Sequence, residues 1–377
     1  MTTDTECLHI DDSCTHKSAT GRAIRAARMG GQAAPQPAVG AFGSPAEVAV
    51  REPSAVISPQ RSAKRPVIDG SMILDYTRLY LSRYVAFPSA AALDLTTAWI
   101  VHASARDRDD TGIGPLIWRA SPRLLVTSKE RGSGKSTVLD LITILTRSRN
   151  GRMPKVTPRA IACVLGRRHE TAILDEAKLI LGAGNRSQEL QGILLAGYTP
   201  RSNYVASKGG KDDPIPLFGP VAYAGKDELI TDTGGMLGDL LDRSVIVRMR
   251  TSPRHMPEVD EDAEDDGDLL AGALAAWTSE VKGELREAAK ALGAADREAG
   301  AVTDGTALRA AQICRPLRAV GMVAGGGWAE RIDEACRRSE DEDMMDVLSA
   351  RFGSAAASAD DDEWGTGSVV SEGDDWA

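Results

Sequence analysis

A short apolar run that leads directly into a glycine-rich loop is the feature that most constrains the fold of this chain. The run is RLLVTS (residues 123–128), the loop is KERGSG (129–134), and a helix-like stretch, KSTVLDLITILTR (135–147), follows at once. An apolar run without alternation is typical of a strand buried on both faces of a parallel sheet. The order of strand, loop and helix therefore predicts an α/β fold.

The sequence continues to alternate after this helix. Strands are expected at residues 154–158, 171–176, 219–225 and 243–249, and helices at 159–168, 187–198 and 234–242. Such alternation predicts a parallel sheet flanked by helices. Two helix-like runs separated by Pro88 precede the sheet, an acidic linker (257–268) follows it, and the chain from there to about residue 350 is expected to be helical.

The loop matches most of the phosphate-binding P-loop pattern G-x-x-x-x-G-K-[ST], with Lys129 where the first glycine belongs. In a P-loop, backbone N–H groups at a helix N-terminus surround the phosphates. Lys135 would reach the β- and γ-phosphates of ATP and Ser136 would hold Mg²⁺. Gly132, Ser133, Gly134 and Thr137 complete the candidate nucleotide-binding set. A side chain at position 129 can be accommodated if its φ is negative.

An acidic pair, Asp175 and Glu176, ends the predicted strand TAILDE some 40 residues after the loop. An aspartate there can hold the Mg²⁺ shell, and the adjacent glutamate can orient and deprotonate the attacking water, which is the Walker B pattern. Alone, the pair would be read as a surface Asp-Glu cap of the next helix. Its place after the P-loop favours a site that hydrolyses ATP with Mg²⁺.

Three arginines are candidates for contacts with the γ-phosphate. Arg243 lies between a predicted helix and the last strand, where an arginine finger reaches a neighbouring subunit; the alternative is an Asp242–Arg243 surface pair. Arg309 and Arg315 could fold a lid over the nucleotide or be solvated helix residues. Lys226 follows the strand where a sensor Asn or Thr would be usual, so the sensor identity stays open.

Two further clusters are weaker candidates. In TPRSNYVASKGGKDD (199–213), Arg201, Tyr204, Lys208 and Lys211 could contact DNA, or the segment is a plain surface loop. Four potential zinc ligands lie near the N-terminus, in a segment that is otherwise expected to be a disordered tail. They are Cys7, His9, Cys14 and His16.

Charge and hydropathy narrow the class of protein. The net charge is -9, yet residues 72–250 hold 25 Lys and Arg against 18 Asp and Glu, so a mildly basic core is compatible with a nucleic-acid partner. No run of about 18 apolar residues exists, and the N-terminus lacks the features of a secretion signal. We therefore expect a soluble cytoplasmic protein. Its five scattered cysteines do not suggest a disulfide framework.

Residues 72–338 resemble a family of P-loop ATPase domains, related to AAA+ and RecA-like ATPases, in phage, plasmid and actinobacterial proteins. Segments that carry the resemblance are PRLLVTSKERGSGKST, TAILDEA, LLAGYTPRSNYV, FGPVAYAG and LLDRSVIVRM. The family loop usually reads S-P-E-P-G-S-G-K-[ST], so it also lacks the first glycine. The domain often follows primase or helicase modules, which implies ATP binding and a setting in DNA replication.

These observations predict five regions: a disordered tail (1–70), a helical collar (71–120), a P-loop ATPase core (121–256), a helical lid (257–350) and a disordered acidic tail (351–377). The expected function is that of an additional-strand P-loop ATPase, helicase-like or DNA-translocating, acting as a homo-oligomer on DNA, with single-stranded DNA favoured. A nucleotide-dependent switch or loader that binds a helicase or primase is the alternative. A small-molecule kinase is a third possibility, although it has no use for the Asp175–Glu176 pair.

Overall fold

The computed structural model describes residues 69–105, 116–167, 169–178, 182, 184–205, 214–227, 235–298 and 305–339. All of them belong to one compact unit of the chain, Pro66–Ala377. The predicted acidic tail lies outside the described residues, as does the predicted N-terminal tail except residues 69 and 70.

A five-stranded sheet with the order β2-β3-β6-β1-β7 forms the centre of this unit. All four neighbouring pairs are parallel, which confirms the predicted α/β fold. The strands are β1 (Arg123–Ser128), β2 (Arg152–Met153), β3 (Ala172–Leu174), β6 (Val221–Lys226) and β7 (Ser244–Arg248). Because β6 lies between β1 and β3, the strand that leads into the loop and the strand that ends in the acidic pair are separated by one extra strand.

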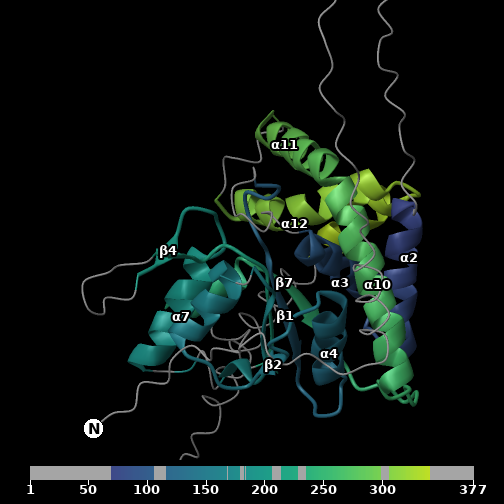
Figure 1. The fold of residues 1–377 in the computed structure, drawn as a ribbon, viewed down its shortest axis with the longest axis horizontal. Helices are drawn as coiled ribbons and strands as arrows, with labels where there is room; N and C mark the ends of the chain where they lie inside the picture. The colour runs from purple at the N-terminus through teal and green to yellow at the C-terminus, as the bar shows by residue number, and fades with distance from the viewer. Residues whose placement is uncertain are drawn as a thin grey trace, which may run out of the picture. The chain divides into compact units, whose positions relative to one another are not determined.

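Helices cover both faces of the sheet, and the strand side chains alternate between two cores. In β1, Leu124 and Val126 pack into the first core, whereas Leu125 packs into the second. In Figure 1, α3 (Ala90–Ser104) and α4 (Lys135–Leu145) lie on one side of the sheet and α7 (Asn185–Ala196) on the other. Burial on both faces explains why β1 reads as a continuous apolar run.

The second strand and the helix after it differ from the sequence prediction. No strand forms at 154–158, where one was expected. The strand in this region is β2, which ends at Met153, and the chain enters α5 (Pro158–Ala162) at the last of the expected strand residues. Thr157 caps this helix by accepting a hydrogen bond from the Ala160 N–H at 3.1 Å, and Pro158 occupies the first helical position. A threonine cap followed by proline is a strong helix start, so it ends the strand early.

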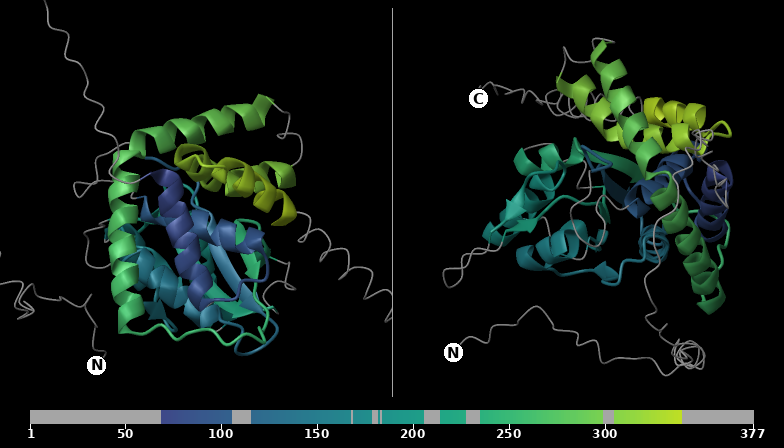
Figure 2. Two further views of the ribbon diagram at one scale, coloured as in Figure 1. Left: turned by 90° about the vertical axis from the view of Figure 1, so that its right-hand side faces the viewer. Right: turned by 45° about the horizontal axis from the view of Figure 1, so that its top comes forward.

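The acidic linker expected at 257–268 is a helix from residue 261 onward. α10 (Glu261–Glu280) is capped by Asp260, whose side chain accepts from the Ala263 N–H at 3.0 Å. Acidic residues in its first turn are favourable because they face the positive end of the helix dipole. The high density of acidic residues predicts a linker, and the helix cap explains why a helix forms instead. This helix runs alongside α2 (Gly70–Tyr84), as Figure 2 shows. The two helices are joined by a hydrogen bond in which the Tyr80 hydroxyl donates to the Ala263 carbonyl at 2.7 Å.

The rest of the described chain is helical, as predicted. α11 (Lys282–Glu298) and α12 (Gly305–Ala324) are followed by a last helix at 328–339. The turn between the last two helices consists of Gly325, Gly326 and Gly327, with φ values of 73°, 59° and 82°. Only glycine adopts three consecutive left-handed conformations without strain, so this turn depends on the GGG sequence.

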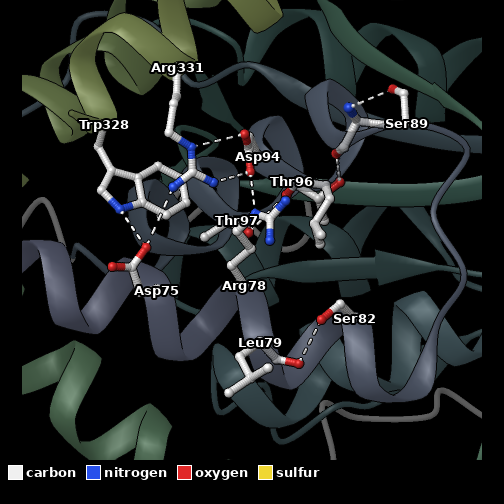
Figure 3. Close-up of polar contacts among 12 residues, drawn as sticks. Asp75, Arg78, Leu79, Ser82, Ser89, Asp94, Thr96, Thr97, Trp328 and Arg331 are labelled. Carbon is white, nitrogen blue, oxygen red and sulfur yellow. Dashed lines mark hydrogen bonds and ion pairs between the residues drawn. The ribbon is translucent and has the colours of Figure 1, made fainter. Parts of the chain in front are cut away.

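A buried carboxylate joins this last helix to the N-terminal helices (Figure 3). The Asp94 side chain, 8% exposed, pairs with Arg78 and with Arg331, both at 2.7 Å. Arg331 also stacks 3.8 Å from the centre of the Trp328 ring, and Trp328 donates its indole N–H to Asp75 at 3.1 Å. Residues from opposite ends of the described chain therefore meet at one carboxylate.

Replacing Asp94 with alanine is expected to lower the free energy of unfolding by about 3 kcal/mol, because two arginines lose the partner that neutralises them in a partly buried position. Thermal or urea unfolding of the purified chain measures this. Asp75→Asn is the matched control, since its side chain is 61% exposed and its loss should cost less than about 1 kcal/mol. Equal stability of the two variants would contradict the role given to Asp94.

Candidate functional site

The glycine-rich loop has the backbone of a phosphate-binding loop. It connects the carboxyl end of β1 to α4, and Gly132 and Gly134 have φ values of 72° and 86°. A Cβ atom added at Gly132 would meet no atom within 4 Å, so the glycine is required by its backbone conformation and the space above it is open. The N-terminus of α4 has no side-chain cap. Its first N–H groups are therefore available to an anion.

Lys135 lies over this loop, held by two serines. Its ammonium group donates to the Ser128 hydroxyl at 2.5 Å and lies 3.3 Å from the Ser133 hydroxyl. Ser133 in turn donates to Ser128 at 2.8 Å. Lys129, at the place of the missing first glycine, is exposed and is not among the residues with positive φ. The expected condition for tolerating a side chain there is met.

The loop borders a cavity of about 1060 Å³. All six predicted nucleotide-binding residues line it, and Asp175, Glu176 and Lys226 line it from the ends of β3 and β6. The carboxyl ends of parallel strands are where open α/β sheets bind ligands. Two segments without a predicted role in the site, residues 84–86 and most of residues 250–259, form much of the remaining wall.

Asp175 and Glu176 follow β3 directly and have different surroundings. Asp175 accepts the Glu176 N–H on one carboxylate oxygen at 2.9 Å and pairs with Arg152 through the other at 2.7 Å. Glu176 is exposed to the cavity and has a φ of 53°, an uncommon value for a residue other than glycine. Strained backbone at such a position is a feature of functional sites, because the fold must hold it in place.

The donor set suits ATP with Mg²⁺. Free helix N–H groups and a lysine suit phosphates, and the hydroxyl of Ser136 and the carboxylate of Asp175 line the same cavity. Mg²⁺ is usually held by one or two carboxylates together with substrate phosphates. Within the described ranges, no three His, Cys, Asp or Glu side chains form a metal cluster.

Arg243 lies at the amino ends of the strands, whereas this cavity lies at their carboxyl ends. It precedes β7, and its carbonyl accepts the Arg123 N–H where β1 begins, whereas the P-loop follows the end of β1. Its guanidinium contacts the Asp239 carbonyl and lies 5.8 Å from the centre of the Tyr198 ring. The predicted Asp242–Arg243 pair is not seen; the nearby acid is Asp239, at 3.6 Å. Arg243 therefore does not line the nucleotide cavity of its own chain.

The two lid candidates also lie away from the cavity. Arg315 pairs with Asp296 of α11 at 2.7 Å. Burial raises the pKa of Tyr198 to about 12, while the nearby charges of Arg123, Arg243, Arg309 and Arg315 act in the opposite direction. The main-chain carbonyl of Tyr198 accepts the Ser121 N–H just before β1, so these arginines lie near the amino ends of the strands. The structure does not bring Arg309 or Arg315 to Lys135.

The DNA-contact candidates are only partly described. Arg201 is exposed with a φ of 99°, and Tyr204 lies in β4 (Asn203–Tyr204), which pairs antiparallel with β5 (Ile215–Pro216). Lys208 and Lys211 fall between these strands and lie outside the described residues, as do the possible zinc ligands Cys7, His9, Cys14 and His16. Searched over its described ranges, the chain has no helix that could cross a membrane.

Comparison with known proteins finds similarity in structure, to several solved chains. No protein-family model matches the chain, and no curated protein matches it in sequence. Among solved structures, the chain is similar to one titled "SCCmec type IV Cch - active helicase", with 13% sequence identity and a TM-score of 0.38. The similarity covers 74% of this chain and 51% of that chain, so it spans about half the length of the helicase structure.

Proposed function

We propose that this chain binds ATP with Mg²⁺ and hydrolyses it. The observation that carries the proposal is that Lys135 and Glu176, which come from segments far apart in the sequence, line the same cavity at the carboxyl ends of β1 and β3. A lysine and free N–H groups bind phosphates, and a carboxylate across the cavity can accept the proton of a water molecule.

In the proposed reaction, Glu176 accepts a proton from water as the water oxygen attacks the γ-phosphorus. The bond from that phosphorus to the β–γ bridging oxygen breaks, and ADP keeps the electron pair of this bond. Lys135 and the α4 N–H groups bind the phosphate oxygens and stabilise their charge. Ser136 and Asp175 would hold Mg²⁺, which neutralises charge on the phosphates.

We further propose that the chain works as a homo-oligomer on DNA, single-stranded DNA favoured, in replication. The oligomer is supported by the position of Arg243, which does not line the cavity of its own chain. The DNA setting is supported by the sequence resemblance and by the β4–β5 pair, which carries Tyr204 and leads into a lysine-containing segment. A switch or loader for a helicase or primase would share the nucleotide site but not the response to DNA.

Hydrolysis of ATP by the purified chain, with and without single-stranded and double-stranded DNA, tests these proposals together. Hydrolysis that DNA stimulates is expected. Hydrolysis that DNA leaves unchanged would favour the switch or loader, and the absence of any nucleotide binding would contradict the proposed function itself.

Replacing Lys135 with alanine is expected to weaken ATP binding about 10- to 100-fold, the size of one charge-assisted hydrogen bond. Fluorescent-nucleotide titration measures it directly. Lys155→Ala is the matched control: that lysine is exposed and does not line the cavity, so its loss should weaken binding by less than about fivefold. If the two substitutions weaken binding equally, the loop does not bind phosphate in the way described.

A further inference from the structure

We propose that Arg152 is a positioning residue of the nucleotide site, which orients Asp175 toward the Mg²⁺ position by fixing it to the P-loop helix. The inference rests on the proposed function. Arg152 does not line the cavity itself, whereas the two carboxylates that it contacts, Asp140 and Asp175, both do.

The contacts form a bridge between two elements. The Arg152 Nε atom lies 2.6 Å from Asp140 Oδ1, and its Nη1 atom lies 2.7 Å from Asp175 Oδ2. Asp140 belongs to α4, Arg152 to β2 and Asp175 to the end of β3. A guanidinium group is planar and donates in fixed directions, so one arginine can hold two carboxylates in a defined geometry. Lysine has no such fork.

The α4 end of this bridge is next to the other proposed metal ligand. Ser136 and Asp140 are four residues apart on one helix, so they are neighbours on the same face. By holding Asp175 to Asp140, Arg152 therefore fixes the Asp175 carboxylate relative to the Ser136 hydroxyl. Each carboxylate oxygen has two lone pairs, so Asp175 can keep its contacts with Arg152 and the Glu176 N–H and still accept from a metal-bound water.

Arg152 also reduces the electrostatic repulsion between the Asp140 and Asp175 carboxylates. Two carboxylates border one cavity, and burial raises the pKa of Asp140, with Asp175 adding to this effect and Arg152 opposing it. Without a cation between them, the carboxylates would repel each other and Asp175 would lose its fixed direction. Arg152 lies between the two carboxylates and contacts both, so it holds them in place.

A role in positioning and a role in stability predict different results for Arg152. Its side chain is 35% exposed, and ion pairs of partly exposed side chains contribute little to stability. Groups that orient a metal ligand typically change metal affinity or activity about 10- to 100-fold. The metal dependence is therefore the property that a merely structural Arg152 would leave unchanged.

The test measures Mn²⁺ binding by electron paramagnetic resonance, with Mn²⁺ replacing Mg²⁺ and a non-hydrolysable ATP analogue bound. Arg152→Gln is expected to raise the Mn²⁺ dissociation constant about tenfold or more and to raise the Mg²⁺ concentration for half-maximal hydrolysis by a similar factor. Arg152→Lys should recover only part of the loss. Binding of the fluorescent nucleotide without metal should remain as in the original chain.

Two further variants serve as controls. Arg149→Gln removes a nearby surface arginine that pairs with Glu170 at 2.7 Å, and it should leave Mn²⁺ binding unchanged. In a chain that carries Asp175→Asn, adding Arg152→Gln should change Mn²⁺ binding by less than about twofold, because the residue that Arg152 orients is already altered.

The outcomes separate this inference from the proposed function. Unchanged Mn²⁺ binding in Arg152→Gln, in a chain that still hydrolyses ATP, would overturn the role of Arg152 alone. Additive losses in the Asp175→Asn background would do the same. A chain that binds no nucleotide in any form would overturn the proposed function, and this inference with it.

Discussion

Replacing Arg243 with alanine is expected to slow ATP hydrolysis about 10³- to 10⁵-fold, the range found for arginine fingers, and to leave ATP binding unchanged. The reason is its place in the fold. Arg243 precedes β7 at the amino ends of the strands, whereas the P-loop lies at their carboxyl ends. It cannot reach the phosphates of its own chain, so its loss should affect only the site of a neighbouring subunit. Steady-state hydrolysis and nucleotide titration measure the two properties separately.

Mixing two inactive variants gives the sharpest form of this test. A chain with Lys135→Ala lacks a working nucleotide site but keeps its arginine, and a chain with Arg243→Ala has the opposite defect. If subunits assemble with Arg243 facing the next site, the mixture should hydrolyse ATP although neither variant does so alone. Full activity of Arg243→Ala on its own would show that Arg243 is not required for hydrolysis, and two inactive variants that do not recover on mixing would show that it does not act on a neighbouring site.

Replacing Glu176 with glutamine is expected to lower the rate of hydrolysis about 10²- to 10⁴-fold, the usual contribution of a general base, while ATP still binds. Glutamine has nearly the same size as glutamate but cannot take a proton from water. The measurements are the rate of phosphate release and the affinity for ATP, since bound ATP should accumulate unhydrolysed in the variant.

Asp175→Asn distinguishes the two members of the acidic pair. It should raise the Mg²⁺ concentration needed for activity, whereas Glu176→Gln should remain inactive at any Mg²⁺ concentration. Hydrolysis by Glu176→Gln at the rate of the unaltered chain would exclude Glu176 as the base, and another group lining the cavity would have to take its place.

The central strands and the loop between β1 and α4 could be predicted because their signals are local. β1 was predicted at 123–128 and occurs there, since burial on both faces requires an unbroken apolar run and the loop that follows requires glycines. The acidic pair was predicted from its position after a second apolar run. In each case the residues that determine the structure are neighbours in the sequence.

The remaining wall of the cavity could not be predicted in this way. Residues 84–86 end one helix, and residues 250–259 connect β7 to α10 without regular structure. Neither segment has a motif, and they face the P-loop only because helices and sheet pack as they do. One contact illustrates this: the Thr251 hydroxyl donates to the carboxylate of Glu130, 121 residues earlier in the chain.

Charge alone was a poor guide to structure in two places. The run of acids at 257–268 suggested a linker, but Asp260 and the acids after it make a favourable helix start. Arg152 could not be predicted as a site residue, because it is one of 45 Lys and Arg residues and no motif distinguishes it. Its proposed role depends on contacts with two carboxylates that come close to it only in the folded chain.

The order of the strands also bears on how the protein must be made. β1 pairs on its two sides with β6 and β7, which end at Lys226 and Arg248. At about 5 to 20 residues per second, a ribosome needs roughly 5 to 25 seconds to add the approximately 100 residues that separate β1 from these partners. During that interval an apolar strand is synthesised but unpaired, and unpaired strand edges promote aggregation. A nascent chain released before Arg248 would keep one edge of β1 open permanently, so prematurely terminated products of this gene should be insoluble or depend on chaperones.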